Sequence, residues 1–213
     1  MKQVYRDQLR ASVRRSSKEW NARAREAARR LLSAVCFRET AESTLRETGS
    51  ALLSPIAFYY SLYHAVIAAL YLDWRTDPTL LRRANHKAVA ARLANNLVKP
   101  RLVDSRSADL LRRLRAFREY ANYTVGGKLQ SDSQYIDAIS DAGSLYADTG
   151  HAMSSLLEFI RNVSDAAPLS PSISERIMVT VGDDIGDDVF QMYLSTADQQ
   201  RVARYLVAEK LST

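Results

Sequence analysis

The feature that most constrains the fold of this chain is a run without charge, because residues 48–72 contain no Asp, Glu, Lys or Arg. By length alone the run could cross a membrane, which takes about 20 apolar residues. However, Pro55, four tyrosines and His64 make it polar for a membrane span. Two apolar and aromatic stripes at helical spacing make residues 55–72 apolar nearly all round. We therefore expect a central, buried helix and no contact of the chain with a membrane.

Four further segments have apolar side chains at helical spacing. Asp77 and Pro78 open one of them, because aspartate caps a helix and proline suits its first turn. Pro100 ends that helix, and Ser105 or Ser107 opens the next one. The fold class predicted is mainly α, an antiparallel bundle of four to five helices joined by short turns. The four segments are residues 18–45, 77–99, 105–126 and 133–163.

The C-terminal part of the chain has a different character. Residues 165–172 hold two prolines among small residues and are typical of a linker. After it, two short strands around an acidic turn and a final helix predict a small α+β appendage, a hairpin plus a helix. The acidic turn lacks the spacing of a calcium loop, so no metal site is expected. The domain prediction is a helical bundle over 1–164, a linker over 165–172 and an appendage over 173–213.

Charge is divided unevenly along the chain. Residues 1–118 hold 24 Lys and Arg against 10 Asp and Glu, a balance of +14, whereas residues 119–213 hold 6 against 14, a balance of −8. Between Arg75 and Arg118 there are 12 basic residues and only three acidic ones. Such a density favours a phosphate-binding surface. The alternative, that arginine-rich helices only keep the chain soluble, stays open.

The end of the fourth helix is the one segment that looks like a site. Leu110, Leu114 and Phe117 fall on one face at 100° per residue, and Arg118 falls in a neighbouring row. The apolar face is predicted to join the core, and the row that contains Arg118 is predicted to bind an anion. The nucleic-acid-binding candidates are Lys87, Arg112, Arg115 and Asn122.

Several common classes of protein are not indicated by the sequence. The start of the chain has no apolar signal region, and a single cysteine, Cys36, suits a reducing compartment, so a cytoplasmic location is expected. There is no dinucleotide-binding fingerprint, P-loop, H-E-x-x-H or G-x-S-x-G motif. We therefore expect neither a cofactor nor a metal.

Three segments in order resemble the HEPN superfamily of small helical domains in prokaryotic toxin, antiphage and nucleotidyltransferase-partner systems. Residues 57–65, AFYYSLYHA, are similar to its tyrosine-rich second helix. Asn85-His86-Lys87 is similar to the histidine that often opens the third helix. Arg118-Glu-Tyr-Ala-Asn-Tyr123 is similar to an R-x-x-A-D-Y ending, with Asn122 in place of the acidic residue. The resemblance covers roughly residues 17–163.

The resemblance implies a homodimer that binds RNA or a nucleotide and cuts RNA without a metal. In many such proteins an R-x4-6-H motif from each of two chains meets in a shared cleft. Arg118 would stabilise the negative charge of the phosphorane, but Tyr123 stands where the histidine is usual. Tyrosine is a poor base at neutral pH, so His64 or His86 would supply the proton carrier. The catalytic candidates are Arg118, Tyr123, His86 and His64.

Three functions remain open from the sequence. The first is a metal-independent endoribonuclease or toxin in a prokaryotic defence or toxin–antitoxin system. The second is a degenerate, non-catalytic HEPN-like dimer that scaffolds a nucleotidyltransferase or a defence effector, which would dock on the appendage. The third is a helical bundle whose basic faces only keep it soluble. Arg118 would then form a structural ion pair, and His64 would be a hydrogen-bonded core residue.

Overall fold

The computed structural model of the chain describes residues 1–48, 53–123 and 142–169. The described residues are mainly helical and contain no strand, which confirms the predicted mainly α class for this part of the chain. The predicted appendage over 173–213 lies outside the described residues. The elements are α1 (Gln3–Arg15), α2 (Ser17–Thr48), α3 (Leu53–Tyr71), α4 (Pro78–Arg82), α5 (His86–Arg92), the π-helical segment η1 (Leu93–Val98), α6 (Arg106–Tyr123) and α8 (Ala142–Ala166).

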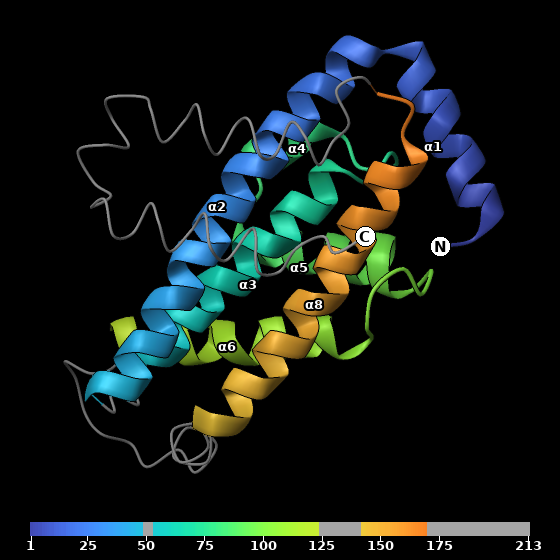
Figure 1. Cartoon of the computed structure of the whole chain (residues 1–213). Helices are drawn as coiled ribbons and strands as arrows, with labels where there is room; N and C mark the ends of the chain where they lie inside the picture. Colours follow the sequence, from blue (N-terminus) through green and yellow to red (C-terminus); the bar gives the residue numbers. More distant parts are fainter. Residues whose placement is uncertain (49–52, 124–141, 170–213) are drawn as a thin grey trace.

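Helix α3 lies at the centre of the molecule, as its apolar circumference predicts. It packs against α2, α6 and α8 and also contacts α4, α5 and η1. Its length and composition would suit a membrane span, but 72% of that stretch is buried inside the protein. Figure 1 shows α2 and α3 side by side in opposite directions, with α6 crossing below them. The antiparallel arrangement therefore holds for α2 and α3, whereas α6 crosses them.

Helix α1 is an element that the sequence analysis did not predict. It presents Tyr5, Leu9 and Val13 to the core, one residue per turn, with charged residues between them. One apolar residue per turn among charged residues gives only a weak amphipathic pattern, so the sequence does not clearly predict this helix. The helix is held in place by Arg10, whose Nε donates to the carbonyl oxygen of Ala166 at 3.3 Å. Helix α8, which ends at Ala166, runs two residues past the predicted boundary at 164.

The single helix predicted over residues 77–99 is wrong, because the segment divides into α4, α5 and η1. Its start is as predicted, with the Asp77 side chain accepting from the Thr79 amide at 2.8 Å and Pro78 in the first turn. The break follows from Asn85, whose side chain accepts from the Ala88 amide at 2.9 Å and so caps a new helix. The helical run ends at Val98, before Pro100.

Helix α6 begins at Arg106 and buries the predicted face. The Asp104 side chain accepts from the Arg106 amide at 2.8 Å and so caps the helix, a role that the sequence analysis gave to Ser105 or Ser107. Leu110, Leu114 and Phe117 are all buried. Because these residues fix the rotation of α6, Arg118 is turned toward α3 and α5.

A buried polar network around Asp73 joins elements that are far apart in the sequence. Asp73 is fully buried and accepts from the Tyr5 hydroxyl at 2.9 Å, from the Thr76 hydroxyl at 2.8 Å and from Asn96 Nδ2 at 3.2 Å. Arg75 pairs with the same carboxylate at 2.9 Å. The network fixes the turn after α3 against α1 and η1, and it therefore helps to position α4 and α5.

Candidate functional site

Five side chains from three helices meet where α3, α5 and α6 come together. We call them the Arg118–His86 cluster, and they are Tyr59, Tyr60, Tyr63, His86 and Arg118. Arg118 Nη1 lies 3.3 Å from His86 Nε2 and donates to the Tyr60 hydroxyl at 3.4 Å. The guanidinium carbon lies 5.5 Å from the ring centroid of Tyr59 and 5.9 Å from that of Tyr60. The sequence candidates Arg118 and His86 are thus in contact, although 32 residues separate them.

Local structure explains how each side chain reaches the cluster. Tyr59 and Tyr63 are four residues apart on α3, so they lie one above the other on the same face. His86 is the first residue of α5 because Asn85 caps that helix. Its ring lies 4.5 Å from the ring of Tyr63, and its Nδ1 is hydrogen-bonded to the Tyr59 hydroxyl.

Arg118 is a buried cation that has no counter-anion among the residues that the structure describes. Its exposed fraction is 8%. Among the described residues no carboxylate lies within ion-pair distance of it, and its Nε has no acceptor. The adjacent Glu119 is already paired with Arg115 at 2.8 Å. Buried charges in proteins are normally paired, so this arrangement favours the binding of an anion from outside the chain.

The contacts of His86 define its protonation state. A guanidinium can only donate, so His86 Nε2 must accept from Arg118 and carry no proton. By this assignment, the proton of the neutral ring is on Nδ1 and faces Tyr59. Burial and the charges of Arg118 and Arg115 lower the pKa of His86, which favours the neutral form. Burial raises the pKa of Tyr59, so its hydroxyl keeps its proton.

His64 lies beside the cluster but makes different contacts. Its Nδ1 is 3.4 Å from Arg30 Nη1, and its ring stacks on Phe37 at 5.6 Å. Burial, together with the charges of Arg30 and His86, lowers the pKa of His64 to about 4. Phe37 also stacks on Tyr60 at 5.1 Å. Half-buried rings thus form an aromatic row with two members inside the cluster, Tyr60 and Tyr63, and two next to it, Phe37 and His64.

Sequence reasoning missed Arg30 and Phe37. They are seven residues apart on α2, so they share one helical face, and this spacing was the only signal available. Without the packing of α2 on α3, nothing in the sequence connects them to His64.

The remaining sequence candidates are distributed as follows. Lys87 is exposed and adjacent to His86. Arg115 is half-buried and paired with Glu119, as described above. Arg112 is exposed, pairs with Asp109 at 3.3 Å and lies about 120° around α6 from Arg118, so it does not join the cluster. Asn122 and Tyr123 are in the last turn of α6, but their side chains lie outside what the structure describes.

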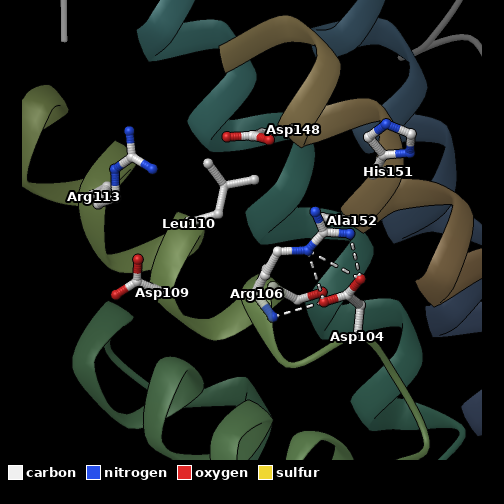
Figure 2. Close-up of a pocket in the computed structure, with 9 residues that line it drawn as sticks. Asp104, Arg106, Asp109, Leu110, Arg113, Asp148, His151 and Ala152 are labelled. Atoms are coloured by element: carbon white, nitrogen blue, oxygen red, sulfur yellow. Dashed lines mark hydrogen bonds and ion pairs between the residues drawn. The ribbon is translucent and has the colours of Figure 1, made fainter. Parts of the chain in front are cut away.

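A hollow of about 210 Å³ lies at the other end of α6, against α8. Figure 2 shows Arg106 turned toward Asp104, with which it pairs at 2.9 Å, and Asp148 and His151 on α8. Three carboxylates and two guanidiniums line this hollow, so it has no excess of positive charge to attract a phosphate. Arg106 precedes Arg118 by 12 residues, about 18 Å along the helix axis, so the two places are separate. Among the described residues, no group of His, Cys, Asp and Glu could hold a metal ion.

Comparison with known proteins gives no match, because no protein-family model, no curated protein and no solved structure is significantly similar to this chain. The functional argument therefore depends on the geometry of the Arg118–His86 cluster.

Proposed function

We propose that the chain binds RNA through the Arg118–His86 cluster and cuts it as a metal-independent endoribonuclease. The observation that carries the proposal is the buried guanidinium of Arg118, which contacts His86 Nε2 and has no carboxylate partner in the described part of the chain. A phosphodiester supplies the missing negative charge and the hydrogen-bond acceptors that a guanidinium prefers.

The side chains around the cluster favour a nucleic acid over a small inorganic anion. The aromatic row offers half-buried rings on which bases can stack, and stacking on aromatic side chains is common in proteins that bind single strands. Arg30 and Lys87 add positive charge near these rings. Together they suit a ligand that has both phosphates and bases, such as a single-stranded RNA.

In the proposed reaction, the ribose 2′-oxygen attacks phosphorus and gives its proton to His86 Nε2. The bond from phosphorus to the 5′-oxygen breaks, and that oxygen takes up a proton from a solvent water molecule. The protonated His86 then gives its proton back to the solvent. The products are a 2′,3′-cyclic phosphate and a 5′-hydroxyl. Arg118 neutralises the charge that develops on the phosphorane, and Tyr59 holds His86 through Nδ1. A bound phosphate would attract the guanidinium and free Nε2 to accept the proton.

The resemblance to the HEPN superfamily supports two further parts of the proposal. Two chains would pair so that their clusters share one cleft, where Tyr123 could donate a hydrogen bond to phosphate. The setting would be a prokaryotic toxin–antitoxin or antiphage system in the cytoplasm.

The test is to incubate the full-length protein with labelled single-stranded RNA in excess chelator and to follow cleavage on a denaturing gel. We expect His86→Asn to slow cleavage by about 10²–10⁴-fold, the usual contribution of a general base. Arg118→Met should also abolish cutting, whereas Arg14→Gln, which removes an exposed charge on α1, should not. Unchanged cleavage by R118M would contradict the proposal.

A second candidate function is a non-catalytic RNA-binding module that scaffolds a partner protein. The observation that favours it is that both ring nitrogens of His86 are occupied, by Arg118 and by Tyr59. The same experiment separates the two candidates. RNA that is bound by the wild type but stays intact supports the binding module.

A further inference from the structure

A second positively charged site adjoins the Arg118–His86 cluster and lies between α4 and α5. It is an open hollow of about 550 Å³, which we call the α4–α5 hollow. Arg82, Arg83 and Arg92 line it, together with Thr79 and Asn85. No carboxylate is among its lining residues. Unlike the hollow in Figure 2, it therefore presents three guanidinium groups with no carboxylate among the described residues that line it.

The break between α4 and α5 creates this hollow. Arg82 and Arg83 come from the end of α4. Asn85 and Arg92 are seven residues apart at the two ends of α5, so they lie on one face. Arg82 lies near the buried Tyr71, and Arg92 Nη1 donates to the Ala88 carbonyl oxygen at 3.5 Å. The arginines therefore lie on two sides of one opening.

We propose that the α4–α5 hollow binds phosphodiester groups of the same RNA strand that occupies the Arg118–His86 cluster. This inference rests on the proposed function. Asn85, which lines the hollow, directly precedes His86, so the hollow adjoins the Arg118–His86 cluster at the start of α5. Three guanidiniums suit phosphates, and contacts to phosphates fix the position of a strand without reading its sequence.

The test compares a labelled trinucleotide with a labelled 12-nucleotide single strand by fluorescence anisotropy, with the full-length protein. The variant is Arg83→Gln with Arg92→Gln, both outside the core. We expect about tenfold weaker binding of the long RNA, and binding of the trinucleotide within about twofold of wild type. The slope of log affinity against log salt should fall by about 1.4, because each phosphate contact contributes about 0.7 on a single strand.

The matched control is Arg14→Gln with Arg15→Gln, which removes the same charge from exposed positions of α1. Equal weakening by the control, no weakening of the long RNA by R83Q/R92Q, or equal loss for both RNA lengths would overturn the inference. If the proposed function itself fails, the outcome is different, because the wild type then binds neither RNA. If R118M weakens the trinucleotide and R83Q/R92Q leaves the long RNA unchanged, only the present inference fails.

Discussion

At the scale of single residues, Arg23 and Arg118 are both buried but have opposite surroundings. Arg23 pairs with Glu19 at 2.7 Å and donates to the carbonyl oxygens of Tyr71, Asp73 and Thr76. Arg118 meets only side chains of the Arg118–His86 cluster and has no acid or carbonyl partner among the described residues. The first arrangement stabilises the fold, whereas the second leaves a charge available for a ligand.

This difference predicts that replacing Arg23 lowers the stability of the protein much more than replacing Arg118. Arg23→Met leaves buried carbonyl oxygens without donors and should lower the free energy of unfolding by about 3 kcal/mol. Arg118→Met removes an unpaired buried charge and should stay within about 1 kcal/mol of wild type. Urea unfolding of wild type and both variants measures the change in the free energy of unfolding. Equal destabilisation by the two substitutions would show that Arg118 is structural.

His64 predicts a dependence of stability on pH. A histidine in an unfolded chain has a pKa near 6.5, whereas the pKa of His64 in the folded protein is about 4. Between these values the unfolded chain binds more protons, so stability is lost as the pH falls from about 6.5 to about 4. The loss from His64 is at most roughly 3 kcal/mol.

The measurement is the free energy of unfolding at pH 7 and pH 4.5 for wild type and His64→Gln. The variant should lose less stability on acidification, since glutamine does not titrate. Part of the loss should remain, because the pKa of His86 is also lowered by burial and by Arg118. If H64Q and wild type lose the same amount, burial of a neutral His64 is not the cause.

At the scale of elements, the cap at Asn85 controls both the break after α4 and the place of His86. Asn85→Ala removes the acceptor for the Ala88 amide and should destabilise the protein by about 1 kcal/mol. It should also slow RNA cleavage, because His86 starts the helix that Asn85 caps. Asn85→Ser keeps a capping oxygen and should retain both properties. A normal cleavage rate in N85A would show that the Asn85 cap is not needed to position His86 for cleavage.

The elements also show what the sequence can predict. The buried faces of α3 and α6 follow from apolar residues that repeat every three to four positions. The break at Asn85 could not be predicted in this way, because a capping residue within a helical pattern competes with continuation and the packing of α5 on α3 settles the outcome.

The candidate site was predicted only in part. Arg118 and His86 were singled out by motif, but their contact depends on how α5 and α6 pack on α3. The lack of a counter-anion for Arg118 is a property of the packed interior, so no spacing in the sequence reveals it. Arg30 and Phe37 enter the site for the same reason, through the packing of α2.

At the scale of the whole molecule, the basic residues between Arg75 and Arg118 serve two purposes. Arg75, Arg106 and Arg112 form ion pairs with Asp73, Asp104 and Asp109. By contrast, four other arginines line places without an acid partner among the described residues, one in the Arg118–His86 cluster and three in the α4–α5 hollow. They are Arg118, Arg82, Arg83 and Arg92. The alternative that these helices are basic only for solubility explains the paired arginines better than the others.

The central proposal is that Arg118, which is buried and has no carboxylate partner among the described residues, binds a phosphate of RNA. The most direct measurement is the affinity of the full-length protein for a labelled single-stranded RNA, determined at several salt concentrations for wild type, R118M and R14Q. We predict binding by wild type that weakens steeply with salt, loss of binding in a folded R118M and near-normal binding by R14Q. RNA binding by R118M equal to that of wild type would contradict the claim.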